Sequence, residues 1–266
     1  MARIWKSPRI KWLVPIICLA VLIIWLLETP SGLLGKADAV GYAVCHRISV
    51  RSFFLDDRPL PLCARCTGMY LGAMAGLLYQ FIKYPRRGGM LNWKTGLPFI
   101  IFAAVWVFDG VNSFLHLLPA GRGLYQPSNL LRLVTGLGMG LSMAAILYPA
   151  FHQTVWRRFD PRPIFQSFRP YLELILLSIV VGILTLTGNP MILYPFALIS
   201  AGGVLVILTM VYTLVWLMLF RKENSLDHPR QLFIPLCAGL LTALVQIGGV
   251  DLLRFGLTGT WAGFHF

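Results

Sequence analysis

Long runs of apolar residues, separated by short polar segments, recur along the whole chain. Most of these runs reach the roughly 20 helical residues needed to cross the hydrocarbon core of a bilayer, and the first is shorter. Seven runs are found, at residues 12–27, 67–83, 97–118, 130–151, 171–189, 191–220 and 232–253. The pattern predicts an all-α integral membrane helix bundle with about seven transmembrane helices. The sixth run is long enough to tilt, or to break near Gly202 and Gly203.

Composition points the same way, since 57% of the 266 residues are hydrophobic, 12% are charged and the mean hydropathy is +0.73. A soluble core of this length does not need so much apolar surface. The longest hydrophilic stretch is residues 28–66, which leaves no room for a separate soluble domain. We therefore expect residues 1–266 to form a single integral membrane domain.

Positive charge indicates the orientation of the helices. Fifteen of the 23 Lys and Arg residues fall in segments on the same side as the N-terminus. Because cytoplasmic loops retain positive charge, the N-terminus is predicted to be cytoplasmic and loop 28–66 extracytoplasmic, in a multi-pass plasma-membrane protein. The net charge of +13 lies mainly in short clusters beside the helices, which favours membrane lipids as partners over nucleic acid.

The first apolar run also resembles a signal peptide, with a basic start and a small-residue site at Ala37-Asp38-Ala39. About a dozen polar residues separate the apolar run from that site, a longer spacing than signal peptides usually have. We therefore expect a retained membrane anchor.

Four soft ligands lie in the extracytoplasmic loop: Cys45, His46, Cys63 and Cys66. Two residues between Cys63 and Cys66 let the chain turn so that both thiols reach one centre, as in zinc sites and thiol oxidoreductases. The group predicts zinc or a similar transition metal, held by three Cys and His46 or by three Cys and water. Two alternatives remain open: a reactive Cys63–Cys66 disulfide with Cys45 as resolving thiol, and a permanent disulfide that pins the loop.

A second candidate site is polar and lies within the membrane. Four polar residues share one face of the third apolar run: Asp109, Asn112, Ser113 and His116. A carboxylate in lipid is costly, so Asp109 should face the bundle and find a partner, for which Arg132 is the expected residue. Asn129 lies on the same stripe as Arg132. Asp109, Asn129 and Arg132 form a candidate substrate or proton site, and a purely structural ion pair is the alternative.

Other residues extend this picture at the outer end of the bundle. Basic side chains suited to phosphate, carboxylate or a lipid headgroup are Arg47, Arg51, Arg65, Arg122 and Arg132. Asp251 and Arg254 lie near the outer end of the last run, where they extend the network or pair with each other. Cys18 and Cys237 lie in apolar runs and are expected to be buried small hydrophobic residues.

Glycines spaced four residues apart indicate which helices pack closely. Gly68, Gly72 and Gly76 form one such stripe, and Gly136 and Gly140 form another. Small residues at this spacing let two helix backbones approach each other. The second and fourth apolar runs are therefore predicted to pack together.

Two motifs resemble those of a family of prokaryotic membrane proteins described as a domain of unknown function. The first comprises Cys45-His46-Arg47 and the run Pro61-Leu62-Cys63-Ala64-Arg65-Cys66-Thr67-Gly68, and the second comprises Asp109-Gly110 and Ser128-Asn129-Leu130-Leu131-Arg132. The resemblance covers roughly residues 40–145. It implies a membrane location and a site built from these motifs, and it carries no established reaction.

The sequence thus favours a membrane protein with an extracytoplasmic Cys/His metal site beside an Asp/Asn/Arg cluster that binds an anionic lipid-linked or small-molecule substrate. A membrane thiol–disulfide oxidoreductase using Cys63 and Cys66 is one alternative. A transporter or lipid flippase coupled through Asp109 and Arg132 is another. The common hydrolase, phosphate-loop and zinc-helix motifs are absent from the sequence, so whether the protein is an enzyme stays open, as does its oligomeric state.

Overall fold

A computed structural model describes residues 8–118, 121 and 123–263. The helices are α1 (Pro8–Glu28), α2 (Gly32–Val44), the short 3₁₀ helix η2 (Ser49–Arg51), α3 (Ala64–Lys83), α4 (Trp93–Leu115), α5 (Asn129–Val155), α6 (Phe168–Leu186), α7 (Pro190–Leu219) and α8 (Pro229–Thr258). The short strands are β1 (Phe54–Leu55), β2 (Arg58–Pro59), β3 (Arg87–Gly89) and β4 (Asp160–Pro163). Each predicted apolar run lies on one of the long helices, so the all-α bundle is confirmed.

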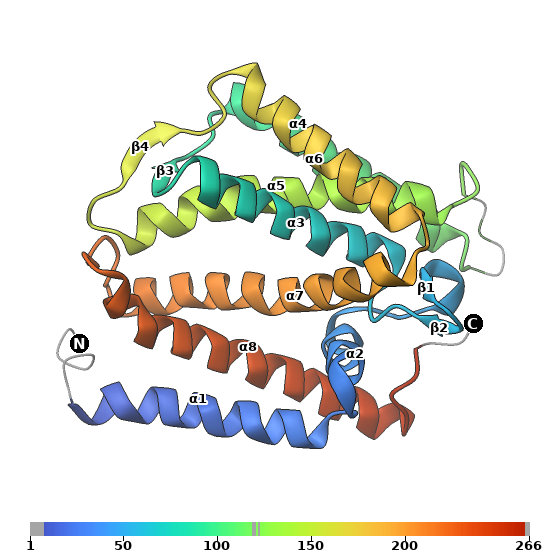
Figure 1. The fold of residues 1–266 in the computed structure, drawn as a ribbon, viewed down its shortest axis with the longest axis horizontal. Coiled ribbons are helices and arrows are strands. Elements are labelled where there is room, and N and C mark those ends of the chain that lie inside the picture. The colour runs from blue at the N-terminus through green and yellow to red at the C-terminus, as the bar shows by residue number, and fades with distance from the viewer. Residues whose placement is uncertain (1–7, 119–120, 122, 264–266) are drawn as a thin grey trace.

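The long helices lie side by side, from α1 through α8, α7, α3 and α5 to α4 and α6 (Figure 1). In the described part of the chain, α1, α4, α5, α6, α7 and α8 are long and apolar enough to cross a membrane. Helix α3 has 20 residues but is less apolar, and it lies in the interior against α5 and α7. Six of the seven predicted spans are therefore supported by length and composition, and α3 remains a prediction as the seventh.

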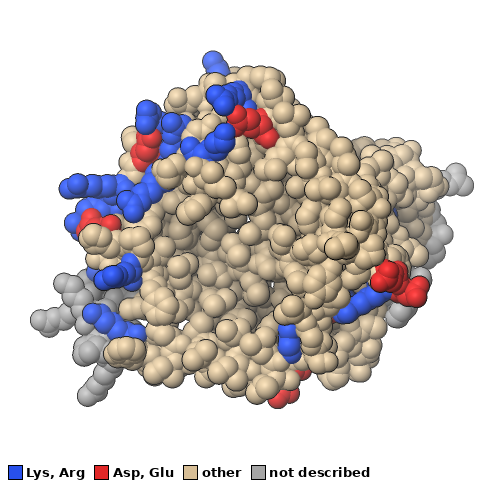
Figure 2. All heavy atoms as spheres, viewed as in Figure 1, with Lys and Arg blue, Asp and Glu red and all other residues tan. Residues whose placement is uncertain are grey.

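Charged side chains lie towards the ends of the bundle. Figure 2 shows Lys and Arg gathered around the end that carries β3 and β4, followed by a broad band without charge. Apolar side chains such as Ile100, Val134 and Ile183 are exposed within the bundle's length, as lipid-facing positions require. The protein is a multi-pass membrane protein.

The glycine stripes bring α3 and α5 together, as predicted. A Cβ atom on Gly68 would lie 2.4 Å from the carbonyl oxygen of Leu133, and one on Gly140 would lie 2.1 Å from that of Met69. Only glycine permits this backbone distance. Gln80 also joins the two helices, because its buried amide donates to the carbonyl oxygen of Ala144 at 2.9 Å.

Four features differ from the sequence-based picture or add to it. Helix α7 continues unbroken through Gly202 and Gly203, so the suggested break is absent. The loop 28–66 is largely structured, since it contains α2, η2 and an antiparallel pairing of β1 with β2. Ala37-Asp38-Ala39 lies within α2, and both alanines are buried. At the other end, β3 pairs with β4 in parallel.

Candidate metal centre and adjoining polar cluster

The candidate site forms where the end of α2 meets the beginning of α3. Cys45 follows the last residue of α2, and Cys63 precedes the first residue of α3. Gly41 allows the contact, because a Cβ atom there would lie 2.0 Å from the carbonyl oxygen of Pro61. Leu62, between Pro61 and Cys63, is fully buried. Two segments separated by 18 residues are thereby held against each other.

The thiols of Cys45, Cys63 and Cys66 converge at this junction. Their sulfur atoms all lie within 4.8 Å of one another, and all three thiols are free. Cys45 and Cys63 are buried, and Cys66 is half-buried. The Sγ atom of Cys45 accepts the backbone N–H groups of Cys63 at 3.3 Å and of Arg47 at 3.5 Å. The predicted cysteine group therefore exists, and it is close enough to hold a metal ion.

Hydrogen bonds within the group affect the pKa values of its thiols differently. The thiols of Cys45 and Cys66 hold the pKa of Cys63 well below its ordinary value, because their hydrogen bonds stabilise its thiolate, and His46 adds to the effect. The hydrogen bond with Cys63 raises the pKa of Cys45 to about 12. These hydrogen bonds therefore shift the pKa values of the two neighbouring thiols in opposite directions, downwards at Cys63 and upwards at Cys45.

His46, the predicted fourth ligand, lies beside this group without joining the three thiols. Its Nδ1 atom accepts the backbone N–H of Ile48 at 3.1 Å. In the neutral ring this places the proton on Nε2, which makes that nitrogen a hydrogen-bond donor instead of a metal ligand. The arrangement suits His46 to donate a hydrogen bond to the sulfur of Cys63.

Arg65, which lies between Cys63 and Cys66, is the partner of Asp109. Its Nε atom donates to the Asp109 carboxylate at 3.1 Å, its terminal nitrogen makes a second, shorter contact with the same oxygen, and Asp109 is only 1% exposed. The expected pairing with Arg132 is therefore wrong. Arg65 leaves α3 on the side of α4, whereas Arg132 is engaged by its own helix: it donates to the Asn129 side chain at 2.8 Å.

The remaining candidate residues surround this ion pair. Asn129 donates to the carbonyl oxygen of Ser52 at 3.3 Å, which connects α5 to the segment that follows η2. Arg51 is buried and donates to the carbonyl oxygen of Ser113 at 2.9 Å. Burial, and then the nearby charge of Arg65, lower the pKa of Arg51. Arg122 lies outside the described residues.

Arginines 51, 65 and 132 are close enough to influence one another electrostatically, and Arg51 and Arg132 also feel the charge of Cys63. We call Arg51, Arg65, Asp109 and Arg132 the arginine cluster. Within it Asp109 is the one carboxylate against three guanidinium groups. The cluster therefore carries excess positive charge directly beside the cysteines.

The loop before α5 covers the arginine cluster. The Tyr125 hydroxyl donates to Asp109 at 2.7 Å. Burial, with this bond as a further cause, raises the pKa of Tyr125 to about 12, so it stays protonated. Asn112 and His116 both contact the Tyr125 carbonyl oxygen, at 2.9 and 2.8 Å. The polar face predicted for this helix thus holds the loop as well as the carboxylate.

The end of α8 closes the cysteine loop from the other side. Arg254 donates to the carbonyl oxygen of Cys45 at 2.8 Å, and the Tyr42 hydroxyl donates to that of Thr260 at 2.7 Å. Arg254 thus joins the end of α8 to the cysteine loop, and its expected link to the Asp109 network stays a prediction. Asp251 is buried beside Trp25. Of the two cysteines in apolar helices, Cys18 is buried as predicted and Cys237 is only half-buried.

Sequence reasoning missed two contributors to the site. Arg65 was identified only as a basic residue, although its position directly before Cys66, at the start of a glycine-rich helix, could have indicated that it faces a neighbouring helix. Tyr125 lies in a loop whose path has no regular periodicity, and no local signal marks it. Both roles depend on how α3, α4 and the loop before α5 pack together.

Comparison with known proteins finds a matching family and similar proteins in two archaea. Residues 45–146 match a family described as "Predicted membrane protein (DUF2085)", and this range contains all three cysteines and the arginine cluster. An uncharacterized protein of Methanocaldococcus jannaschii, MJ1492, is 30% identical over 123 residues, which cover 46% of this chain and 72% of that protein. An uncharacterized protein of Methanothermobacter thermautotrophicus is 32% identical over 106 residues, covering 39% of this chain and 83% of that protein. No solved structure matches. The chain belongs to this family of predicted membrane proteins.

Proposed function

We propose that the protein binds a zinc-like ion through Cys45, Cys63 and Cys66 on the outer side of the membrane, and that the adjoining arginine cluster binds an anionic substrate. The observation that carries the proposal is the mutual distance of the three sulfur atoms, at most 4.8 Å. In a tetrahedral site with Zn–S bonds of about 2.3 Å, the sulfur atoms are about 3.8 Å apart. A small inward movement of the thiols would suffice.

The surroundings of the cysteines support a charged centre. Two backbone N–H groups donate to the sulfur of Cys45, and N–H donors of this kind stabilise thiolates bound to a metal. Positive charge from Arg51 and Arg132 lies nearby, which offsets the negative charge of three thiolates around a divalent ion. With His46 engaged through its Nδ1 atom, the fourth coordination position is left for water or substrate. Catalytic zinc sites have such an open position.

The arginine cluster supplies the second half of the proposal. Arg51 and Arg132 are buried, and among the described residues neither is paired with a carboxylate. Buried guanidinium groups without a counter-charge are costly, so an anion that enters the cluster is stabilised. Arginine is also the residue that most readily makes bidentate contacts with phosphate or carboxylate.

Metal analysis of the purified full-length protein tests the first half. We expect about one equivalent of zinc or a similar ion per chain, because three thiolates provide most of a tetrahedral site. Cys63→Ser and Cys66→Ser should each lose the metal. Cys237→Ser, a cysteine on another helix, should retain it. Substoichiometric metal in the wild-type protein, together with a Cys63–Cys66 disulfide under native conditions, would reject the proposal.

A thiol–disulfide oxidoreductase is the second candidate. It is favoured by the position of Cys63 at the N-terminus of α3 and by its lowered pKa, both typical of a reactive thiolate. Against it, the Cys63 side chain is only 3% exposed, so a partner protein cannot reach its sulfur without local opening. Trapping of a mixed disulfide through Cys63 in metal-free and metal-loaded protein alike would favour this candidate over the metal site.

A further inference from the structure

An apolar groove runs along the lipid-facing side of the bundle, between α4 and α6. Helix α5 forms its floor. Its outer part has a volume of about 520 Å³, within the range of small-molecule sites. Lining residues include Val105 of α4, Val134 of α5, and Ile179 and Ile183 of α6. The walls are almost entirely hydrocarbon.

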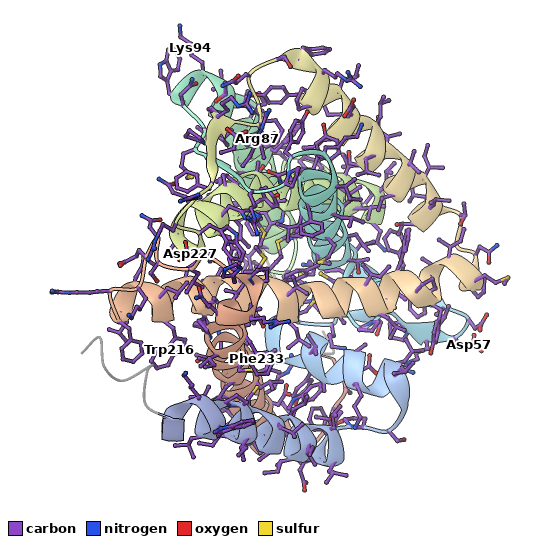
Figure 3. All side chains as sticks on the ribbon, turned by 60° about the vertical axis from the view of Figure 1, so that its left-hand side comes forward. Asp57, Arg87, Lys94, Trp216, Asp227 and Phe233 are labelled. Atoms are coloured by element: carbon purple, nitrogen blue, oxygen red, sulfur yellow. The ribbon has the colours of Figure 1, made fainter. Side chains whose placement is uncertain are left out.

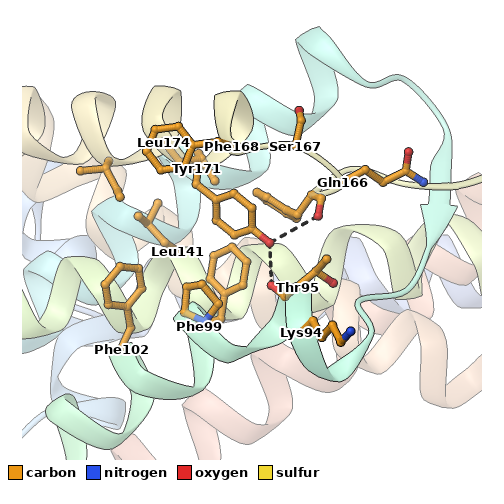
Figure 4. Close-up of a pocket in the computed structure, with 13 residues that line it drawn as sticks. Lys94, Thr95, Phe99, Phe102, Leu141, Gln166, Ser167, Phe168, Tyr171 and Leu174 are labelled. Atoms are coloured by element: carbon orange, nitrogen blue, oxygen red, sulfur yellow. Dashed lines mark hydrogen bonds between the residues drawn. The ribbon is translucent and has the colours of Figure 1, made fainter.

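The groove continues towards the opposite end of the bundle. A second cavity, of about 430 Å³, shares Phe102, Leu141 and Ile175 with the first. Here the Tyr171 hydroxyl donates to the carbonyl oxygens of Thr95 at 2.7 Å and Phe165 at 3.3 Å, so α6 is tied to α4 at this end (Figure 4). Together the two cavities make one elongated apolar groove.

At its outer end the groove reaches the arginine cluster. Thr135 lines the groove, and its hydroxyl donates to the Asp109 carboxylate at 3.4 Å. Arg132 lies one turn earlier on α5 and is 6% exposed. Its buried Nε–H has no hydrogen-bond partner among the described residues. A buried donor without an acceptor is costly, so this position lacks an anion that would complete it.

On the basis of the proposed function, we propose that the anionic ligand is a lipid with one long hydrocarbon chain ending in a phosphate, its chain in the α4–α6 groove and its phosphate on the arginine cluster. The single groove accommodates a single chain. Three guanidinium groups and one carboxylate leave about two positive charges, and a phosphate monoester carries about −1.5 to −2 with three acceptor oxygens. The Nε–H of Arg132 gains its missing acceptor.

The chain half of the proposal is tested with a photoreactive single-chain alkyl phosphate and the full-length protein in nanodiscs of neutral phosphatidylcholine. We expect saturable labelling of α4 and α6. Ile179→Trp fills the groove and should reduce labelling about tenfold, the effect of roughly 1.4 kcal/mol. Val180→Trp is the matched control: Val180 is 52% exposed beside Ile179 at 49%, but it does not line the groove, so labelling should be unchanged.

The headgroup half is tested by competition and by Arg132→Gln. Loss of a charge-assisted contact should weaken probe binding about tenfold. An alkyl carboxylate of equal chain length should compete poorly. The proposal is overturned if Ile179→Trp labels like the wild type, if the alkyl carboxylate competes as well as the alkyl phosphate, or if inorganic phosphate alone displaces the probe.

Metal content, measured on the same samples, separates this inference from the proposed metal site. Saturable labelling of protein that contains no metal would contradict the proposed metal centre and support the lipid site. Full metal content together with unsaturable labelling would contradict the proposed lipid site and support the metal centre.

Discussion

Arg65 gives the Cys-Ala-Arg-Cys segment two functions. Cys63 and Cys66 point to the junction with α2, while Arg65 reaches α4 and pairs with Asp109. Ala64, which lies between Cys63 and Arg65, is fully buried. Successive residues at the start of one helix therefore connect the candidate metal centre to the arginine cluster. A substitution at Arg65 should therefore affect both the candidate metal centre and the arginine cluster.

Replacing Arg65 tests the observed ion pair. Arg65→Gln leaves the Asp109 carboxylate buried without its counter-charge, which should cost about 3–5 kcal/mol of unfolding free energy. Unfolding in mixed micelles would measure this loss. Arg132→Gln, which removes the partner first expected for Asp109, should cost much less. The double variant Arg65→Gln with Asp109→Asn should recover most of the loss, and equal losses for the two single arginine variants would contradict the assigned pairing.

At the level of helices, contact between α3 and α5 decides the geometry of the site. The α3 backbone lies directly against α5 along the glycine stripes, and the same two helices carry Cys66 and Arg132. A shift of one helix along the other would separate Cys66 from Arg132. The stripes therefore have a positional role as well as a packing role.

Enlarging one glycine should disrupt this contact. In Gly140→Leu the new side chain meets the backbone of Met69 and Ala73, and such overpacking costs about 1–3 kcal/mol or more. Thermal unfolding in detergent would report the loss. Gly202→Leu on α7 is the control, since no atom lies within 4 Å of a Cβ atom there. A similar fall in both variants would show that the α3–α5 contact is not special.

For the whole molecule, the orientation in the membrane follows from the charge distribution and stays a prediction. Asp57, beside the β1–β2 hairpin, and Asp227 lie at opposite ends of α7, and both are exposed (Figure 3). An impermeant maleimide added to intact cells should label Asp57→Cys but not Asp227→Cys. Permeabilised cells should label both. The reverse pattern would place the cysteine loop in the cytoplasm, and the wild-type protein provides the background from native thiols.

Much of the architecture could be read from the sequence, because lipid exposure imposes long apolar runs and close helix contact demands small residues. The positions of α3, α5 and the cysteine group are examples. Helix α2 was missed because its 13 residues are too few to cross a bilayer, and Lys36 and Asp38 interrupt its apolar run. The partner of Asp109 was also missed: choosing between Arg65 and Arg132 depends on how α3 and α5 are rotated about their axes, and neither charge pattern nor spacing determines that rotation.

The closure of the cysteine loop by the end of α8 affects biogenesis. Arg254 lies 212 residues after Tyr42, and Thr260 lies 218 after it, so the contacts that close this loop join early and late parts of the chain. At about 5–20 residues per second, translation leaves the loop without them for roughly 10–40 s. During that interval we expect the thiols of Cys45, Cys63 and Cys66 to be more accessible to oxidants and to metal donors than they are once the end of α8 has closed the loop.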